Sequence, residues 1–349
     1  MSGLWAARAG AADRAVHTRH LHPAWALPGT RLGRIGWPAG RVQVRWHYWW
    51  QAHLLDCVLD AHTRAPTRWR RDTVTELLRG MRLRNLTGWV NHYHDDIAWL
   101  GLALQRSARL AGVRRPGAER AIAHRLRIGK GPDGGMRWRV GDDFVNVPAT
   151  GPAAIFFARR GNLGLASSLA DWIIEHLIDP GTGLAFDGAR VNPDGSVRTV
   201  ERAVYSYCQG VLLGACVELA TSTGRQRWAE QADRTVHAVA GHLTERGVLR
   251  GHGGGDGGLF TGILARYLAL AATSGLSSGP VAARLVLGSA DAAWRNRAVA
   301  AGGPVFGPQW SVPALLPQPG RAERDLSVQL SGWMLVEAAA ELERAQALP

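Results

Sequence analysis

The stretch NHYHDDIAWLGLALQRSARLAG, residues 91–112, places two adjacent acids, Asp95 and Asp96, directly before a long apolar segment. From Ile97 onward the segment is apolar nearly all round at helical spacing, which is typical of a helix buried in an inner layer. The two acids would then occupy the first turn of that helix. Burying an acidic pair is costly unless the site uses it. The stretch therefore predicts both an inner helix and a functional pair.

Segments with helical spacing recur along the whole chain, and turns rich in glycine and proline separate them. Some segments, such as 204–221, are apolar nearly all round, whereas others, such as 226–244, carry a broad polar face. The expected helices cover residues 3–20, 45–64, 71–85, 95–111, 117–128, 149–160, 163–179, 204–221, 226–244, 258–274, 279–297 and 325–346.

About twelve helices of two kinds suit a double ring in which outer helices cover inner ones. We therefore expect an all-α fold, an (α/α)6 barrel, in a single domain spanning residues 1–349. An open helical solenoid is the alternative, and the lack of a repeat at fixed period disfavours it.

Composition and charge limit the function classes. The net charge of +13 rests almost entirely on arginine, because Lys130 is the only lysine, and no nucleic-acid motif accompanies it. We therefore expect no nucleic-acid partner. No uncharged apolar run is long enough to span a membrane. Arginines and histidines interrupt residues 1–30 where a signal peptide needs an apolar core, so we expect a cytoplasmic protein, and we take it to be a monomer.

The cysteines and histidines predict no metal site. Cys57, Cys208 and Cys216 stand in no metal-ligand spacing and are interpreted as small core residues. The thirteen histidines are scattered. We expect no metal and no cofactor.

Two neighbouring aspartates can perform paired acid and base chemistry. At the start of a helix their carboxyls can lie about 4–7 Å apart, because adjacent Cα atoms are ~3.8 Å apart and side chains turn by ~100° per residue. That range includes the ~5–5.5 Å separation of a retaining glycosidase. Close carboxylates also push their pKa values apart. The alternative is that the helix dipole alone favours acids in the first turn.

The residues around the pair indicate a carbohydrate. Asn91, Tyr93, His94 and Trp99 crowd the two acids, and the chain has fifteen tryptophans. Sugars stack their C–H faces on aromatic rings, so sugar pockets are lined by tryptophan and tyrosine. We expect about half of the tryptophans to be core residues only.

Several motifs, in order along nearly the whole chain, resemble those of glycoside hydrolase family 76, the endo-α-1,6-mannanases and related transglycosylases. Asn91-x-Tyr93-x-Asp95-Asp96-x-Ala98-Trp99 resembles the family signature. The other similar segments are 47–52, 134–138 followed by Asn146, 186–188, 207–211 and 256–268. Four residues depart from the family pattern: His94 for tyrosine, Cys208 for asparagine, Thr261 for lysine, and Thr150 for a second asparagine.

The resemblance implies an (α/α)6 barrel and a retaining hydrolase of α-1,6-linked mannan or mannooligosaccharides. It implies Asp95 as nucleophile and Asp96 as general acid/base. The residues expected to bind substrate are Trp49, Trp50, Asn91, Tyr93, His94, Trp99, Trp138, Asn146, Tyr207, Gln209 and Asp256.

Alternatives to this interpretation stay open. The protein could transfer the glycosyl group to another sugar, or bind carbohydrate without catalysis. Asp256 is equally well explained as the N-cap of the helix that follows it, and His94 as a packed histidine. Tyr207 could pack within an inner helix instead of facing the substrate.

Overall fold

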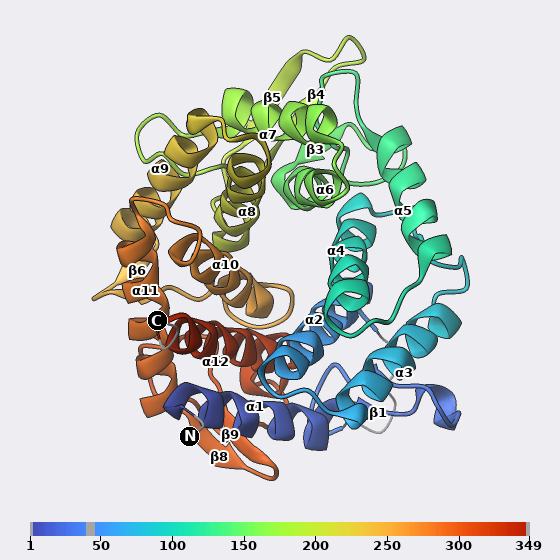
Figure 1. The fold of residues 1–349 in the computed structure, drawn as a ribbon, viewed down its shortest axis with the longest axis vertical. Helices are drawn as coiled ribbons and strands as arrows, with labels where there is room; N and C mark the ends of the chain where they lie inside the picture. Colours follow the sequence, from blue (N-terminus) through green and yellow to red (C-terminus); the bar gives the residue numbers. More distant parts are fainter. Residues whose placement is uncertain (1–2, 40–45, 347–349) are drawn as a thin grey trace.

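The computed structural model describes residues 3–39 and 46–346. Within these ranges the chain forms twelve α-helices (Figure 1). They are α1 (Leu4–His20), α2 (Tyr48–Arg64), α3 (Arg68–Arg84), α4 (His94–Leu110), α5 (Pro116–Gly129), α6 (Val147–Arg159), α7 (Leu163–Leu177), α8 (Ser206–Thr223), α9 (Gln226–His242), α10 (Gly257–Ala272), α11 (Gly279–Arg295) and α12 (Leu326–Gln346). Every expected helix is confirmed, with ends that differ by no more than three residues. Residue 45, the expected start of the second helix, lies outside the described residues.

The helices form two concentric rings (Figure 1). The even-numbered helices make the inner ring, and each of them packs on the next until α12 returns to α2. The odd-numbered helices cover this ring from outside, with α1 packed on α12. The expected (α/α)6 barrel is confirmed. The solenoid alternative is wrong, because the last inner helix contacts the first.

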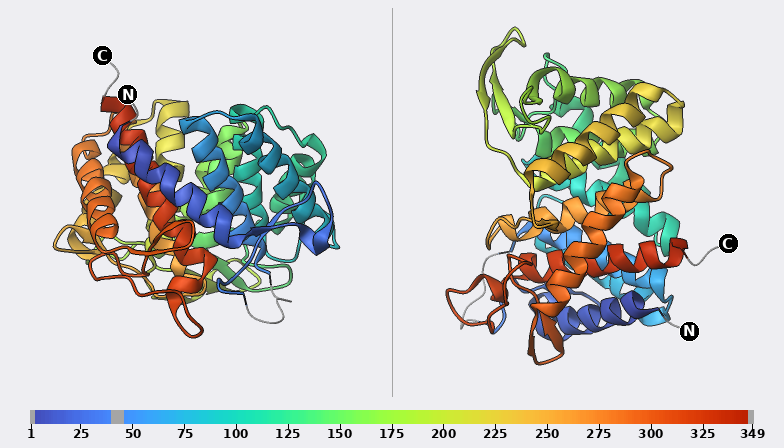
Figure 2. Two further views of the ribbon diagram at one scale, coloured as in Figure 1. Left: turned by 90° about the horizontal axis from the view of Figure 1, so that it is seen from below. Right: turned by 90° about the vertical axis from the view of Figure 1, so that its left-hand side faces the viewer.

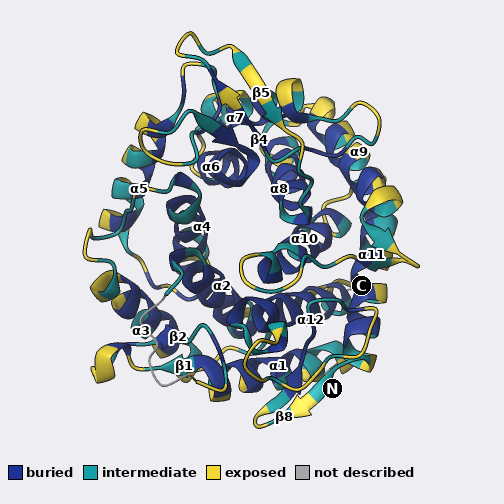
Figure 3. Ribbon diagram, turned by 180° about the vertical axis from the view of Figure 1, so that it is seen from behind, coloured by how far each residue is buried: buried dark blue, intermediate teal, exposed yellow. Residues whose placement is uncertain are grey.

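The pattern of apolar residues decides which ring a helix joins. Inner helix α8 buries residues on all its sides from Ser206 to Leu219, whereas outer helix α9 buries one stripe that includes Trp228, Ala232 and Val239. Figure 3 shows the same contrast, with buried inner helices and exposed residues on the outward faces of the outer ones. A helix apolar all round is stable only when it is covered on all sides.

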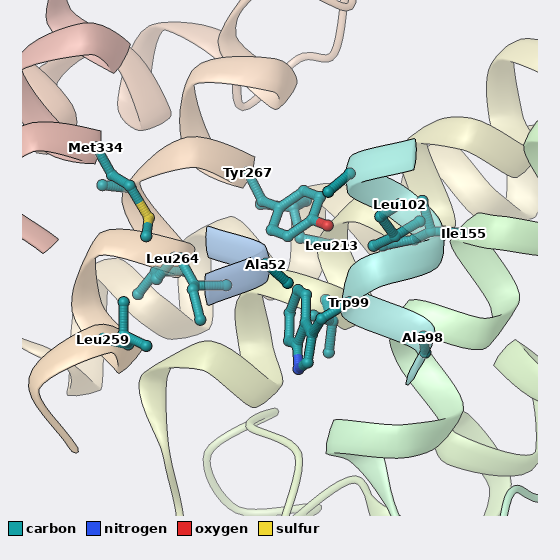
Figure 4. Packing of buried hydrophobic residues seen from close by; sticks show 14 of the residues in the cluster. Ala52, Ala98, Trp99, Leu102, Ile155, Leu213, Leu259, Leu264, Tyr267 and Met334 are labelled. Carbon is teal, nitrogen blue, oxygen red and sulfur yellow. The ribbon is translucent and has the colours of Figure 1, made fainter. Parts of the chain in front are cut away.

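Side chains fill the middle of the barrel. The buried cluster in Figure 4 combines Ala52 of α2, Leu102 of α4, Leu213 of α8 and Tyr267 of α10. Gly214 lets α8 and α10 approach, since a Cβ atom there would lie 2.5 Å from the Tyr267 ring. Burying each large apolar side chain contributes about 1.5–3 kcal/mol. The barrel interior is therefore a packed core and not a channel.

All inner helices point the same way. Trp49 in the first turn of α2 contacts Tyr207 of α8, with ring centroids 6.4 Å apart, and Phe260 of α10, at 6.3 Å. In the later turns, Asp60 of α2 pairs with Arg266 of α10 at 2.6 Å. Equivalent turns of these three inner helices thus meet at the same level of the barrel. One end of the barrel holds all the inner amino termini, and the other end holds the carboxyl termini.

Four charged side chains close the carboxyl-terminal end. Arg106 and Arg266 each contact both Asp56 and Asp60. Burial raises the pKa of Asp60, but the two guanidinium groups outweigh it and hold that pKa below its usual range. A cavity of about 280 Å³ beside this four-residue cluster is lined largely by charged residues of α2, α4, α10 and α12. Buried charges are tolerated here because each one is paired.

Loops and short strands cover the amino-terminal end. Figure 2 shows long connections gathered at the end opposite the start of α1 and the end of α12. One antiparallel sheet has the order β3 (Phe144–Asn146), β4 (Gly188–Val191), β5 (Val197–Glu201). Three two-stranded pairs complete the strands: β1 (Leu21–His22) with β2 (Leu32–Gly33), β6 (Thr244–Glu245) with β7 (Val248–Leu249), and β8 (Ala298–Ala300) with β9 (Gly303–Val305).

Two further observations concern the described residues as a whole. The three cysteines are free and buried, as the sequence predicted. No helix in residues 3–39 and 46–346 is long and apolar enough to cross a membrane.

Replacing Arg266 by methionine should destabilise the fold by about 3–5 kcal/mol, because the buried Asp56 and the partly buried Asp60 would keep their charges with one partner fewer. Urea unfolding followed by circular dichroism measures the loss. Arg295→Met is the matched control, since the Arg295–Asp291 pair is exposed and should contribute less than about 1 kcal/mol. Equal losses in both variants would show that the four-residue cluster has no special role in stability.

Candidate active site

Two adjoining cavities form a groove at the amino-terminal end of the barrel. They share Trp49, Asp95, Trp138 and Asp256 in their walls. The first, about 470 Å³ and here called the Asn91 cavity, is also lined by Trp46, His47, Tyr48, Asn85, Asn91, His92, Tyr93 and Asp96. The second, about 320 Å³ and here called the Tyr207 cavity, is also lined by Trp99, Phe144, Asn146, Asp187, Tyr205, Tyr207 and Phe260.

Asp95 and Asp96 lie in the first turn of α4, as the sequence predicted. The Asp95 carboxyl accepts hydrogen bonds from the indole Nε1 of Trp138 at 3.1 Å and from the backbone N–H of Asp96 at 2.8 Å. The Asp96 carboxyl accepts one from the side-chain amide of Asn91. The backbone N–H of Trp49 donates to Asp96 as well. Neutral donors from separate segments therefore hold each carboxyl.

Local backbone geometry sets these donors in place. The Asn91 side-chain oxygen accepts from the backbone N–H of Tyr93 at 2.9 Å, so a turn just before α4 fixes the amide that reaches Asp96. The backbone N–H of His94 donates to the Trp138 carbonyl at 2.8 Å. The loop that carries Trp138 is thus tied to the start of α4, which brings its indole to Asp95.

Burial raises the pKa values of both acids, and the charge of Asp95 raises that of Asp96 further. Burial raises the pKa of Asp95 to about 6, although the donors from Asp96 and Trp138 oppose the rise. Burial and the neighbouring Asp95 carboxylate together raise the pKa of Asp96 well above its ordinary value. The pKa of Asp96 thus rises further than that of Asp95, so Asp95 ionises first, which is the order that a nucleophile and a general acid require.

Asp256 adds a third carboxylate to the groove. It occupies the N-cap position of α10 but makes no side-chain capping hydrogen bond. Instead, its Oδ1 accepts from the indole Nε1 atoms of Trp49 at 3.1 Å and Trp50 at 2.8 Å, and lies 3.9 Å from His47 Nδ1. The carboxylate links α2 to α10 and faces both cavities. The geometry thus disfavours the N-cap interpretation of Asp256.

Flat aromatic surfaces line the Tyr207 cavity. The rings of Tyr207 and Phe260 stack with centroids 4.0 Å apart at an interplanar angle of 12°. Tyr205 packs edge-on against Phe260 at 5.3 Å. Trp138 and Phe144 form another part of the wall. Surfaces of this kind stack well on sugar rings.

The structure brings most of the expected site residues together in the groove. Those that line it are Trp49, Asn91, Tyr93, Asp95, Asp96, Trp99, Trp138, Asn146, Tyr207 and Asp256. Asn146 also caps α6, because its side-chain oxygen accepts from the backbone N–H of Ala149 at 3.2 Å.

Three expected site residues do not line the groove. Trp50 is 1% exposed and reaches Asp256 from behind while its ring stacks on His47. His94 is buried, and its Nδ1 contacts the Arg137 carbonyl at 2.7 Å, which fits the alternative of a packed histidine. The Gln209 amide pairs with the backbone N–H and carbonyl of Ala185 at 2.8 Å each. All three therefore pack behind the groove and contact residues near its walls.

Other lining residues were not among those expected from the sequence. Asp187 precedes β4 and faces the Tyr207 cavity, where burial raises its pKa to about 6 and the Cys208 thiol lies 3.8 Å away. Tyr205 and Phe260 come from the starts of α8 and α10. Asp187 and Phe260 lie in segments 186–188 and 256–268, which resemble family motifs. The sequence pattern did not show which side chains of these segments face the groove.

Comparison with known proteins agrees with the fold and identifies the family. The family model of glycosyl hydrolase family 76 matches residues 12–343. The mannan endo-1,6-alpha-mannosidase DCW1 of Candida glabrata is 26% identical over 230 residues, which cover 55% of this chain and 49% of that protein. The chain thus spans about half the length of this curated relative.

Solved structures are similar over nearly the whole chain. The GH76A alpha-1,6-mannanase from Salegentibacter sp. HEL1_6 is 29% identical with a TM-score of 0.85, covering 96% of this chain and 99% of that one. An inactive variant of that enzyme, in which two neighbouring aspartates are asparagines, is in complex with alpha-1,6-mannotriose and is 28% identical with a TM-score of 0.85. It covers 96% of this chain and 99% of that one. Since the family match extends from residue 12 to residue 343, the chain belongs to glycoside hydrolase family 76.

Proposed function

We propose that this protein is a retaining glycoside hydrolase that cleaves α-1,6-mannosidic linkages in mannan or mannooligosaccharides. The observation that carries the proposal is the pair Asp95 and Asp96, partly buried side by side in an aromatic groove and with their pKa values pushed apart. Such a pair supplies an ionised nucleophile and a protonated acid at one glycosidic bond.

The first step forms a glycosyl-enzyme. The Asp95 carboxylate attacks the anomeric carbon while the Asp96 carboxyl donates its proton to the leaving oxygen. The bond between the anomeric carbon and that oxygen breaks, and an ester bond to Asp95 replaces it. Trp138 orients Asp95, and the amino terminus of α4 stabilises its negative charge before the attack.

The second step returns the enzyme to its starting state. The Asp96 carboxylate takes a proton from a water molecule, whose oxygen attacks the anomeric carbon and releases Asp95 as a carboxylate. Asn91 donates to the ionised Asp96 during this step. A sugar hydroxyl in place of water would make the reaction a transglycosylation.

The proposed substrate rests on the groove and on the relatives. The stacked Tyr207 and Phe260 rings offer flat apolar faces, while Asp187 and Asp256 offer acceptors for sugar hydroxyls. The similar Salegentibacter enzyme is an alpha-1,6-mannanase, and its doubly substituted inactive variant holds alpha-1,6-mannotriose. Those two findings favour an α-1,6-linked mannan over other glycans.

Asp95→Asn and Asp96→Asn should each lower the rate of mannan cleavage by about 10³-fold or more, because each removes one of two groups that act together. Chromatography of sugars released from linear α-1,6-mannan measures the loss. Asp291→Asn on the outer face of α11 is the control and should cleave at the wild-type rate.

The same assay separates the competing functions. Full activity in both Asp95→Asn and Asp96→Asn would rule out a catalytic role for the two aspartates. Longer products that form only with excess acceptor sugar would identify a transglycosylase. Binding of mannan by the wild-type protein without any turnover would identify a binding protein.

The pH profile of kcat/KM should be bell-shaped, with an acid limb near pH 6, where Asp95 gains its proton, and an alkaline limb set by Asp96. Trp138→Phe removes a donor that stabilises ionised Asp95, so the pKa of Asp95 rises and the acid limb moves to higher pH. Asn91→Ala removes the donor to ionised Asp96, so the alkaline limb moves to higher pH.

Initial rates between pH 4 and pH 9 test this assignment. The two variants should move different limbs, and wild-type protein assayed beside them is the reference. A shift of the acid limb by Asn91→Ala, or of the alkaline limb by Trp138→Phe, would reverse the roles given to the two aspartates.

A further inference from the structure

An exposed tryptophan lies outside the groove on the segment between α1 and α2. The side chain of Trp25 is 56% exposed. Its backbone is left-handed, with φ 48° and ψ 34°, and the next residue, Ala26, has φ 59°. This conformation is unfavourable for residues with a Cβ atom, and such strained positions cluster at ligand-contacting sites. The strain here presents a large apolar ring to solvent.

Firm contacts hold this strained turn. The Thr30 hydroxyl donates to the Leu27 carbonyl at 2.6 Å and accepts from the backbone N–H of Ala24 at 3.1 Å. The backbone N–H of Arg31 donates to the Glu76 carbonyl on α3 at 3.0 Å. A Cβ atom at Gly80 would lie 2.1 Å from the Arg31 carbonyl oxygen, so this glycine allows the segment to lie directly on α3. The segment that carries Trp25 is thus held in place by its hydrogen bonds and by its packing on α3.

Arg84 links Trp25 to the wall of the Asn91 cavity. Arg84, the last residue of α3, lies over the Trp25 ring at 5.8 Å and over the Trp46 ring at 5.7 Å. Trp46 itself lines the Asn91 cavity, together with Asn85, the residue after Arg84. The three side chains Trp25, Arg84 and Trp46, here called the outer surface, lead from the cavity that holds Asp95 and Asp96 toward solvent.

We propose that the outer surface binds the part of an α-mannan chain that extends beyond the Asn91 cavity, sugar units away from the bond that is cleaved. This inference rests on the proposed function. It adds that the protein recognises a longer stretch of the mannan chain than the groove alone can hold. Indole rings stack on the C–H faces of neutral sugars, and the fixed N–H groups of a guanidinium donate to their hydroxyls. A glycan fits better than a protein partner because the surface continues a groove that already contains the acid pair.

A distal contact of this kind makes recognition depend on chain length. We expect a polymer to gain additional stacking at Trp25 that a trisaccharide bound at the aspartates lacks. The extra contact acts on binding and not on the reacting atoms, so it lowers KM without changing kcat. It also favours cleavage within a chain over removal of single end units.

The test compares wild-type protein and Trp25→Ala on linear α-1,6-mannan and on α-1,6-mannotriose. We expect KM for mannan to rise roughly 3- to 10-fold, with kcat and the mannotriose kinetics unchanged. Trp25→Tyr should keep most of the wild-type KM, because it retains an aromatic face. Trp69→Ala is the matched control: Trp69 is 46% exposed but lies in the first turn of α3, at the other end of that helix from Arg84.

Two results would contradict the proposal that the outer surface binds mannan. One is an unchanged KM for mannan in Trp25→Ala, and the other is an equal loss on mannan and mannotriose. Electrophoresis through gels that contain mannan gives a readout without turnover, since retardation of the wild-type protein should weaken in Trp25→Ala and not in Trp69→Ala. Equal retardation of Trp25→Ala and Trp69→Ala would also contradict the proposal that the outer surface binds mannan. Failure of the proposed function differs from this, because wild-type protein would then release no sugar from mannan.

Discussion

The direction of the inner helices is the constraint on which the rest of the site depends. Because the even-numbered helices all begin at one end, their first turns or N-cap positions bring together Trp49 of α2, Asp95 of α4, Asn146 before α6, Tyr207 of α8 and Asp256 before α10. The positive ends of the helix dipoles meet at that same end and stabilise a carboxylate that burial would otherwise neutralise. The site is thus a consequence of parallel packing, and the loops add its outer walls.

The two ends of the barrel differ in whether their carboxyl groups are paired with cations. At the carboxyl-terminal end Asp56 and Asp60 are paired with Arg106 and Arg266. At the groove, the described lining residues of both cavities include no arginine or lysine, although the chain carries a net charge of +13. A cation beside the acid pair would lower both pKa values and remove the proton that a general acid must give. Among the described residues, the arginines therefore lie outside the walls of the two cavities.

Sequence reasoning predicted the helices and the acid pair, because a 3.6-residue period and a first-turn position are local properties. It could not tell which residues of an inner helix face the groove, since a helix that is apolar all round has no polar face to mark direction. Tyr207 faces the cavity, whereas Gln209, two positions later, turns to the backbone of Ala185. Contacts such as Trp50 with Asp256 join residues 206 positions apart and leave no trace in spacing.

The pKa values of the two adjacent aspartates differ because of the groups around them and because of their effect on each other. Asp95 and Asp96 share one turn and one degree of burial, so their local sequence gives no reason for one to ionise before the other. Each carboxyl accepts two hydrogen bonds, Asp95 from the Trp138 indole and the N–H of Asp96, and Asp96 from Asn91 and the N–H of Trp49, so the number of donors does not separate their pKa values. Once Asp95 is ionised, its charge raises the pKa of Asp96 and keeps the proton there. The Trp138 indole, 43 residues farther along the chain, is one of the donors that favour the ionised form of Asp95.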